Sequence, residues 1–354
     1  MWPKILIVAT SRKTRGGITS VIKAHEIGEQ WKVCQCRWIE THVDAGFFAK
    51  LFILFKGLIQ YLWFLPQAKM VHIHLSEPIS AKRKRVFFSL AKLFGKKTIV
   101  HFHAFSPKTT IYGQNSGLYR CLFSNADAVV VLSDYWKRIV SEEFNIGEKV
   151  RVIYNPCPSI LMSEKYEKTK SILYAGTLNA RKGYADLIKA FGKIADKYPE
   201  WRLALAGNGE IEEGHQLARN LEIEDKCDFL GWINGTAKDQ IFKQASIFCL
   251  PSYAEGFPMA VLDAWAYGLP VVTTPVGGLP DIADDGNNLL LFEPGNIEQL
   301  AICLEKAVAD ESLRNSLSEE SLKLAETTFN ISTINRQIGE LYKEVSEIKK
   351  YNLC

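Results

Sequence analysis

The chain has 354 residues, of which 47% are hydrophobic and 23% are charged. These values exclude a disordered chain, a collagen-like chain and a coiled coil, and the length predicts two domains. The net charge of +4 is unevenly divided: residues 1–160 carry 23 Lys/Arg and 10 Asp/Glu, a net +13, whereas residues 161–354 carry 20 and 29, a net −9. This division predicts that only the first half meets a polyanion or an anionic surface.

Short apolar runs alternate with amphipathic stretches along the whole chain. Continuous Val/Ile/Leu strands separated by helices are typical of parallel sheets covered on both faces, and two such series in tandem predict two doubly wound domains. The helical stretches include Tyr184–Lys197 and Ser332–Lys350. The predicted strands are Lys4–Ala9, Val71–Leu75, Thr98–Phe102, Ala128–Leu132, Val150–Ile153, Ser171–Ala175, Arg202–Ala206, Cys227–Leu230, Ile247–Leu250, Pro270–Thr273 and Leu289–Phe292.

The loop after the first strand ends in Gly16 and Gly17, directly before a predicted helix. Two glycines let the backbone approach a ligand closely, and the helix start offers free N–H groups and a positive dipole end. An ordinary tight turn with solvated basic side chains has the same pattern. The sequence Gly-x-Gly-x-x-Gly is absent from this loop, which argues against a nicotinamide dehydrogenase.

The stretch Phe47–Pro66 is aromatic and apolar, contains Lys50 and Lys56, and is soon followed by the basic run 82–85. Together with the positive first half, this pattern suggests contact with an anionic membrane surface. A buried helix followed by a solvated basic helix start explains the pattern equally well. The longest apolar part, Leu51–Pro66, is interrupted by two polar side chains, and we predict that it falls short of a bilayer span.

Two predicted strands end in a His-x-His pair, His72 with His74 and His101 with His103. Alternation puts both members of a pair on one face of their strand, and such pairs can bind metal. Because no acidic or cysteine cluster accompanies them, we favour two different sites without a metal. His103 would then face the cleft between the domains, and the other three would be buried and hydrogen-bonded.

The segment 155–159 holds two prolines within three residues, and the net charge changes sign nearby. Two closely spaced prolines break a helix or a strand. We therefore predict a domain boundary here, with residues 1–158 as the first domain and residues 159–331 as the second.

The eight cysteines form no Cys-x-x-Cys pair and no zinc-finger spacing. The apolar run at the N-terminus is too short for a signal peptide. We therefore expect a cytoplasmic protein with reduced thiols.

Two loops of the second half follow predicted strands and contain glycine. In the loop 176–183, Arg181 and Lys182 stand at the start of a helix, where cations oppose the helix dipole. A bound anion would explain them, and two solvated surface cations are the alternative. The loop 206–210, with two glycines, either passes a base or phosphate or forms a simple turn.

The segment 250–268 carries the most information. Glu255 precedes a helix that begins at Pro258, and Asp263 lies about one and a half turns inside that helix. The first amides of the helix suit a diphosphate, whereas carboxylates accept hydrogen bonds from sugar hydroxyls. The combination indicates a sugar nucleotide, with Glu255 on the hexose and Asp263 on the ribose. A helix cap at Glu255 and a solvated Asp263 are the alternative.

The chain resembles retaining glycosyltransferases of family 4, whose GT-B fold has two Rossmann-like domains. The resemblance covers nearly the whole chain and is strongest over Ser171–Pro294. It implies two doubly wound α/β domains that face a cleft, with a C-terminal helix, 332–354, crossing back to pack on the first. The motifs that carry it are the Glu-Gly-Phe-Pro turn 255–258 with an acidic residue eight positions after Glu255, the segments 268–272 and 276–278, Gly16-Gly17, His103, Asn155-Pro156 and Lys182-Gly183.

The resemblance also implies roles for residues. The first domain would bind the acceptor and the second the nucleotide-sugar donor. The catalytic residues would be His103 near the transferred sugar, Lys182 at the leaving diphosphate and Glu255 on the sugar hydroxyls. The donor-binding residues would be Gly16, Gly17, Thr177, Arg181, Lys182, Asn208, Gly209, Glu255, Gly256, Phe257, Pro258, Met259, Ala260 and Asp263.

Two positions depart from the family pattern. Thr177 stands where the family has Arg directly after the glycine, and Asp263 stands where it has the longer Glu. Either Arg181 supplies the missing charge from another position or the donor site is weaker. The shorter Asp263 loses about 1.5 Å of reach toward the ribose.

The implied reaction moves a hexose-type sugar, with retention, from a nucleotide-diphosphate-sugar, for which UDP is favoured over GDP. Cations and helix-end amides would stabilise the leaving diphosphate, so we expect no metal and no cofactor. The expected acceptor is a saccharide, lipid-linked at the inner face of the plasma membrane, in lipopolysaccharide or capsule biosynthesis. No nucleic-acid-binding motif is present. A sugar-nucleotide epimerase of the same fold and a non-catalytic nucleotide-sugar-binding subunit are the alternatives.

Overall fold

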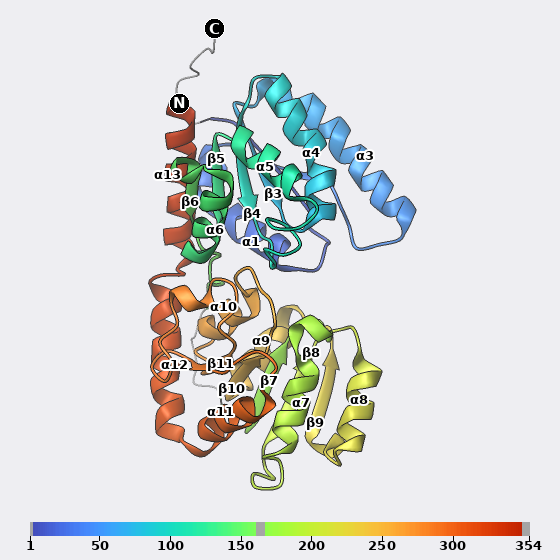
Figure 1. Ribbon diagram of the computed structural model, residues 1–354, viewed down its shortest axis with the longest axis vertical. Coiled ribbons are helices and arrows are strands. Elements are labelled where there is room, and N and C mark those ends of the chain that lie inside the picture. The colour runs from blue at the N-terminus through green and yellow to red at the C-terminus, as the bar shows by residue number, and fades with distance from the viewer. Residues whose placement is uncertain (1–2, 161–166, 349–354) are drawn as a thin grey trace. The chain divides into compact units, whose positions relative to one another are not determined.

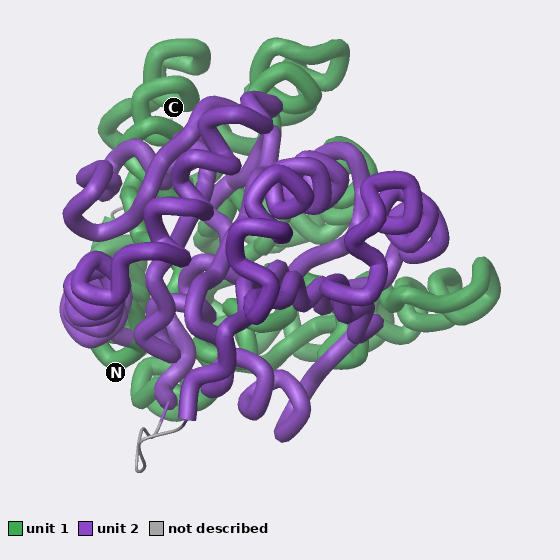
Figure 2. The backbone as a smooth tube through the Cα atoms, turned by 90° about the horizontal axis from the view of Figure 1, so that it is seen from below, with its two compact units in different colours: residues 1–156, 331–354 green, residues 157–330 purple. Residues whose placement is uncertain are grey.

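The computed structural model describes residues 3–160 and 167–348 (Figure 1). The chain divides into two compact units (Figure 2): an N-terminal unit of residues 1–156 and 331–354, and a C-terminal unit of residues 157–330. The chain thus leaves the N-terminal unit at Pro156 and returns to it at Ile331.

The N-terminal unit is built on a six-stranded sheet in the order β2-β1-β3-β4-β5-β6, with every neighbouring pair parallel. Parallel strands need crossover connections, which the helices between them supply. The strands are β1 (Ile5–Ala9), β2 (Arg37–Glu40), β3 (Met70–Leu75), β4 (Lys97–Phe102), β5 (Ala128–Val131) and β6 (Val150–Val152).

The helices of this unit lie on both faces of the sheet. On each face, a hydrophobic core fills the space between the sheet and the helices. One core lies beneath α3, α4, α5 and α6, and the other lies beneath α1 and α13. The helices are α1 (Gly17–Glu26), α2 (Glu29–Val33), α3 (Phe47–Phe64), α4 (Pro78–Leu93), α5 (Ser116–Asn125), α6 (Asp134–Phe144) and α13 (Ile331–Glu347), with short 3₁₀ turns at Leu65–Gln67 and Gly147–Lys149.

The C-terminal unit repeats this plan with a sheet in the order β12-β11-β10-β7-β8-β9, again parallel throughout. The two doubly wound α/β sheets expected from the sequence are therefore confirmed. The strands are β7 (Ser171–Ala175), β8 (Arg202–Ala206), β9 (Cys227–Gly231), β10 (Ile247–Leu250), β11 (Val271–Thr273) and β12 (Leu290–Leu291).

Six α-helices belong to the described part of the C-terminal unit. The predicted helix Tyr184–Lys197 ends earlier, at Gly192, where the backbone changes to shorter-range turn hydrogen bonds such as Lys193 N–H to Ala190 O at 3.2 Å. The helices are α7 (Tyr184–Gly192), α8 (Ile211–Asn220), α9 (Gly235–Gln244), α10 (Met259–Ala266), α11 (Ile297–Ala309) and α12 (Glu311–Glu326), with 3₁₀ turns at Ala180–Lys182, Glu224–Lys226 and Leu279–Asp281.

The C-terminal helix α13 packs on the N-terminal unit, as the predicted fold requires. It contacts α1 and α2, and Ile334, Ile338 and Tyr342 lie in the core beneath it. The predicted helix extended to Lys350, which lies outside the described residues.

The sequence missed strand β2. It is only four residues long, begins and ends with a charged residue, and pairs with β1 alone, at the edge of the sheet. Such a short edge strand lacks the continuous apolar run that marked the others.

The prediction that the apolar stretch is too short for a bilayer is wrong as to length. Lys56 does not interrupt the helix, and Phe47–Gln67 is continuously helical over 21 residues, about 31 Å. By length and composition this helix could cross a membrane, and only 17% of its most apolar window is buried.

Both sheets reverse their winding direction at one point. In the N-terminal unit the reversal lies between β1 and β3, and in the C-terminal unit it lies between β7 and β10. Ligands of open parallel sheets bind outside the carboxyl ends of the strands at such switch points. The loops after β7 and β10, 176–183 and 251–258, are therefore where the fold of the C-terminal unit favours a site.

Candidate nucleotide-sugar site

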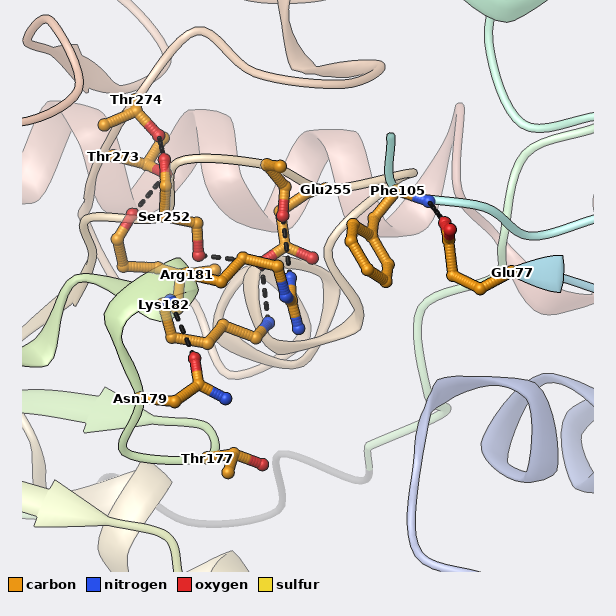
Figure 3. Close-up of polar contacts among 12 residues, drawn as sticks. Glu77, Phe105, Thr177, Asn179, Arg181, Lys182, Ser252, Glu255, Thr273 and Thr274 are labelled. Atoms are coloured by element: carbon orange, nitrogen blue, oxygen red, sulfur yellow. Dashed lines mark hydrogen bonds and ion pairs between the residues drawn. The ribbon is translucent and has the colours of Figure 1, made fainter. Parts of the chain in front are cut away.

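The two loops at the switch point of the C-terminal unit meet through a buried carboxylate (Figure 3). Glu255 Oε1 accepts hydrogen bonds from Lys182 Nζ at 2.6 Å and Ser252 Oγ at 2.7 Å, and Arg181 Nη1 lies 3.5 Å away. Glu255 itself is 7% exposed. Two cations face one carboxylate, which leaves the cluster with one net positive charge and suits an anionic ligand.

The charge of Glu255 is maintained by its partners. Burial alone would raise its pKa, but the charges of Lys182 and Arg181 outweigh burial and lower the pKa below its usual value. All three contacts use Oε1, so the other carboxylate oxygen, Oε2, takes part in none of them. Glu255 therefore serves as an anchor for two cations and retains an acceptor oxygen.

Arg181 and Lys182 do not start helix α7, contrary to the sequence prediction. They lie in the 3₁₀ turn Ala180–Lys182, which Asn179 caps by accepting the Lys182 N–H at 3.0 Å. Gly183 follows with φ of +69°, and a Cβ there would lie 2.0 Å from Pro251 O. The turn thus needs glycine at 183, and it directs both cations toward the loop after β10, where Arg181 also donates to Ala254 O.

The turn that holds Glu255 packs against a second glycine pair, Gly277 and Gly278. Gly277 has φ of +63°, and a Cβ there would lie 2.2 Å from Glu255 O. Gly278 N–H donates to Gly256 O at 2.9 Å. The Gly277-Gly278 motif therefore fixes the backbone on which Glu255 stands.

Helix α10 begins immediately after this turn. Pro258 is its N-cap rather than its first residue, and no side chain caps the helix, so the alternative of Glu255 as a helix cap is wrong. The first amides, those of Met259 and Ala260, have no acceptor within the helix and are available to an anion. The side chain of Phe257 turns inward and packs against Phe329.

Asp263 is paired rather than solvated. Its Oδ2 lies 2.7 Å from Lys238 Nζ of α9, and its side chain is 19% exposed. Burial raises the pKa of Asp263, and Lys238 only partly opposes this. The expected ribose acceptor therefore already has a cationic partner on the neighbouring helix.

The glycine loop after β8 packs against the loop after β7. Asn208 O accepts from Leu178 N–H at 2.8 Å, and a Cβ on Gly207 would lie 1.7 Å from Gly176 O. Gly209 has φ of +119°. Asn208 and Thr177 are both exposed beside this contact, so the two loops form one continuous edge.

The remaining predicted residues lie in the N-terminal unit. Gly16 has φ of +140° and is the N-cap of α1, with open space where a Cβ would stand; Gly17 is the first residue of that helix. His103 directly follows β4, and its Nε2 lies 2.9 Å from His74 Nδ1. The structure thus puts these three residues at the carboxyl ends of β1 and β4.

The histidine pairs form one ladder, so the expectation of two separate sites is wrong. His74 and His101 are register partners on the adjacent strands β3 and β4. The ring of His25 of α1 lies 6.4 Å from that of His101, and its Nδ1 lies 2.8 Å from Asn335 Oδ1. His72 Nδ1 lies 2.8 Å from Tyr342 Oη. Helix α13 therefore closes the ladder through two polar contacts.

Not every ladder nitrogen is hydrogen-bonded, contrary to our expectation. Within the described residues, both ring nitrogens of His101 and the Nε2 atoms of His25 and His72 are buried without a partner. Burial lowers the pKa of His25 to about 4 and that of His72 to about 3. It also lowers the pKa values of His74, His101 and His103 well below the ordinary value. The imidazoles are therefore neutral at pH 7.

A metal would need the ring nitrogens to converge. The ligand atoms of His72, His74 and His101 lie within 4.8 Å of one another. However, the rings are stacked, with interplanar angles of 7° to 30°, and imidazole lone pairs lie in the ring planes. Nearly parallel planes do not direct three lone pairs at one ion, so the cluster would have to rearrange to bind a metal.

Sequence reasoning missed three residues of the C-terminal site: Ser252, Asn179 and Lys238. Ser252 is fully buried between Glu255 and the Thr274 hydroxyl, which donates to Ser252 O. Its place after a strand and three residues before Glu255 could have indicated this contact. Lys238 gave no indication, because only the fold brings α9 beside Asp263.

The sequence of the C-terminal unit matches a known family. The family of glycosyl transferases group 1 matches residues 162–324. The match covers 163 of the 354 residues and lies within the C-terminal unit. The matched segment includes the loops after β7, β8 and β10, and therefore Lys182, Glu255 and Asp263.

Known proteins resemble the chain to different extents. An uncharacterized glycosyltransferase of Haemophilus influenzae is 32% identical over 207 residues, 57% of this chain and 58% of the relative. The lipopolysaccharide core biosynthesis glycosyltransferase LpsE of Rhizobium meliloti is 33% identical over 149 residues, 42% of each chain. The chain thus spans about half the length of these curated relatives.

The fold extends the similarity beyond the matched segment. The crystal structure of Anabaena HepE in complex with UDP-glucose superposes with a TM-score of 0.79 over 97% of this chain and 100% of HepE, at 19% identity. The similarity therefore includes both sheets, and the chain has the GT-B fold.

Proposed function

We propose that this protein transfers a hexose-type sugar from a nucleotide-diphosphate-sugar to a saccharide acceptor. The observation that carries this proposal is the cluster of Lys182, Arg181 and Glu255 at the switch point of the C-terminal unit, next to the uncapped start of α10. Positive charge and helix amides suit a diphosphate, and a buried carboxylate with an oxygen to spare suits sugar hydroxyls.

The proposed donor is a UDP-sugar in preference to a GDP-sugar. HepE, which shares the fold, was crystallised with UDP-glucose. In the proposal Asp263 accepts hydrogen bonds from the ribose, and the exposed edge made by Thr177, Asn208 and Gly209 lies along the nucleotide. The C-terminal unit binds the donor, and the N-terminal unit binds the acceptor.

The proposed chemistry neutralises the leaving group with protein cations rather than with a metal ion. The bond between the anomeric carbon and the diphosphate oxygen breaks, and negative charge grows on the diphosphate. Lys182, Arg181 and the first amides of α10 stabilise that charge. Glu255 holds Lys182 in place with Oε1 and binds sugar hydroxyls with Oε2.

The acceptor hydroxyl then forms the new bond to the anomeric carbon from the face that the nucleotide leaves. Its proton passes to the departing phosphate oxygen, and the anomeric configuration is retained. Gly16 and Gly17 approach the donor, and His103, kept neutral by burial, accepts or donates a hydrogen bond at the transferred sugar. These roles rest on the resemblance to family 4.

The proposed acceptor is a saccharide carried on a lipid at the inner face of the plasma membrane, as in cell-surface polysaccharide biosynthesis. LpsE, to which part of the chain is similar, is named for lipopolysaccharide core biosynthesis. The basic first half of the chain and the apolar helix α3 support a reaction next to an anionic membrane.

Product analysis tests this proposal. We expect the purified protein to consume one UDP-sugar with EDTA present, and to form an α-linked product from an α-linked donor when a saccharide acceptor is added. Conversion of the donor to another UDP-sugar without acceptor would instead identify an epimerase. UDP binding without donor consumption by any acceptor mixture would identify a binding subunit.

A further inference from the structure

Helix α3 exposes a stripe of large apolar side chains along its whole length. Phe48, Phe52, Phe55, Ile59 and Trp63 follow one another at helical spacing and are 60–82% exposed. A helix in a globular protein normally turns such a stripe toward the core. In α3 the stripe faces away from the core.

The orientation of α3 is fixed by its inner face. Leu54 and Leu58 pack against the core of the N-terminal unit, and Tyr61 donates its hydroxyl hydrogen to Phe87 O at 2.7 Å. A Cβ on Gly57 would lie 2.0 Å from Glu40 O, so the helix approaches β2 as closely as backbone allows. Rotating α3 to bury the outer stripe would lose all of these contacts.

Helix α4 extends the exposed apolar face. Its aromatic residue Phe87 packs edge-on against Tyr61 of α3, and Figure 1 shows the two helices beside each other on one side of the unit. We use the term α3–α4 surface for the exposed apolar side chains of both helices and of the residue after α4, together with four exposed cations of the two helices. These are Phe47, Phe48, Leu51, Phe52, Phe55, Ile59, Leu62, Trp63, Ile79, Val86, Leu93 and Phe94, with Lys50, Lys56, Lys82 and Arg85.

The charge around this surface is mainly positive, although exposed Asp44 precedes α3 and Asp127 pairs with Lys92 of α4. Residues 45–126 contain 12 Lys/Arg and a single acidic residue, Glu77. Lys84 is an exception among the basic run, because it is fully buried and donates to His74 O. Lys50, Lys56, Lys82 and Arg85 are exposed and form no ion pair with any residue that the structure describes.

We infer that the α3–α4 surface docks onto an anionic lipid bilayer, with α3 lying in the plane of the interface. This inference rests on the proposed function, in which a lipid-linked acceptor brings the protein to a membrane. Aromatic and aliphatic side chains enter the headgroup region, and the surrounding cations meet anionic lipid headgroups. A shallow hollow of about 270 Å³, lined by Phe52, Phe55, Lys56, Ile59 and Gln60, opens on the same face.

Two observations favour an in-plane helix over a membrane span, although α3 is long enough to span. Lys56 lies near the middle of the helix, on the exposed side, where a span would carry its charge into the hydrocarbon core. A span would also pull Tyr61 and the leucines of the inner face out of the unit. An in-plane helix keeps the inner contacts and lets Lys56 reach the headgroups.

The same charges disfavour a second copy of the chain as the occupant. A symmetric dimer through this surface would bring like cations together, with Glu77 the only acidic residue of the segment to offset them. An anionic leaflet instead supplies the complementary charge.

Flotation with lipid vesicles tests this inference. The probes are vesicles of phosphatidylglycerol with phosphatidylcholine and vesicles of phosphatidylcholine alone, with a light-scattering measurement of mass in solution. We expect the wild-type protein to float with the anionic vesicles and much less with the neutral ones. The triple variant Phe52→Ser, Phe55→Ser, Ile59→Ser should remain folded, since these side chains are exposed, and stay at the bottom of the gradient.

A second variant separates charge from apolar contact. This triple variant carries Lys56→Gln, Lys82→Gln and Arg85→Gln. It should partition onto anionic vesicles about a hundredfold less, at roughly fivefold per cation removed. The matched control Ile302→Ser changes a side chain of α11 that is also 65% exposed and should float like the wild type. Wild-type protein that floats with neither vesicle overturns the inference. The inference is also overturned if the wild-type protein is a dimer in solution and the apolar triple variant is a monomer.

Thermal stabilisation by UDP, measured on the same preparations, keeps this test separate from that of the proposed function. Stabilisation by UDP without flotation would refute the docking inference alone. Flotation without UDP binding would refute the proposed donor site and leave the surface standing.

Discussion

The two units bury ionisable side chains at the carboxyl ends of their strands by opposite means. In the C-terminal unit, Glu255 stays charged because Lys182, Arg181 and Ser252 surround one of its oxygens. In the N-terminal unit, the histidine ladder is kept neutral by burial, and both nitrogens of His101 are left without a partner in the described part of the chain.

The Glu255 cluster keeps buried side chains charged, whereas the histidine ladder keeps them neutral. In the proposed function, the paired carboxylate and two cations exchange partners with an incoming diphosphate and sugar, and their charges are already desolvated and positioned. Adding a proton to these stacked imidazoles is costly, because burial disfavours their charged form. The C-terminal unit should therefore respond to charge-removing mutations, and the N-terminal unit to acid.

The largest effect is expected for the carboxylate at the centre of the charged site. Glu255→Ala removes the anchor of Lys182 and the proposed acceptor for sugar hydroxyls, and we expect kcat to fall at least about a hundredfold. Sugar release from the donor, measured by UDP formation, checks this. Glu298→Ala, on an exposed carboxylate of α11, is the control. Equal turnover in Glu255→Ala and wild type would show that the charged cluster is structural.

Acid should destabilise the N-terminal unit before the C-terminal one. Folding lowers the pKa of His25 from 6.5 to about 4, so the unfolded chain binds more protons below pH 6.5, and stability falls as the pH drops from 6.5 toward 4. At pH 5 the loss from His25 alone is about 2 kcal/mol.

Hydrogen exchange followed by mass spectrometry at pH 7 and pH 5 would localise this loss. After correction for the intrinsic exchange rate, β3, β4 and α13 should lose protection, while β7, β8 and β10 should not. Only one of the seven histidines, His215, lies in the C-terminal unit. Equal loss in both units would contradict the assignment of the ladder as the acid-sensitive element.

A smaller effect is expected from breaking the ion pair between Asp263 and Lys238. Lys238→Met removes the partner that opposes burial at Asp263, so the Asp263 pKa should rise further and its carboxyl group should accept ribose hydrogen bonds less well. We expect UDP to bind about tenfold more weakly by calorimetry, at one to two hydrogen bonds lost. Asp263→Asn should weaken UDP to a similar degree, and unchanged affinity in both variants would remove Asp263 from the site.

The smallest effect concerns the position at which the chain departs from family 4. Thr177 is exposed beside the loop after β8, so an arginine fits there without repacking. Thr177→Arg should tighten UDP binding about threefold by adding a cation near the diphosphate. Weaker binding would indicate that Arg181 already occupies the position that the family arginine fills.

The sequence predicted the features that depend on local pattern. Eleven strands, the parallel sheets and the residues of the Glu255 turn followed from apolar runs, glycines and the resemblance to family 4. The contacts that only tertiary structure creates did not follow. The anion that balances Arg181 and Lys182 proved to be Glu255, 73 residues from Lys182, and the partner of Asp263 came from another helix.

The same limit applied to the N-terminal unit. Alternation placed each His-x-His pair on one face, but the parallel register that joins them into one ladder and the closure by α13 depend on the assembled sheet. For α3, composition alone left a buried helix and a membrane-facing helix equally acceptable. The contact of Gly57 with β2 decides which face turns outward.

Titration of UDP into the wild-type protein and into Lys182→Met, with EDTA present, tests most directly whether the charged cluster is a donor site. We predict saturable binding of one UDP per chain to the wild type and at least about tenfold weaker binding to the variant, since one charge-assisted contact to the diphosphate is lost. Equal affinity for both proteins, or no binding to the wild type at millimolar UDP, would contradict it.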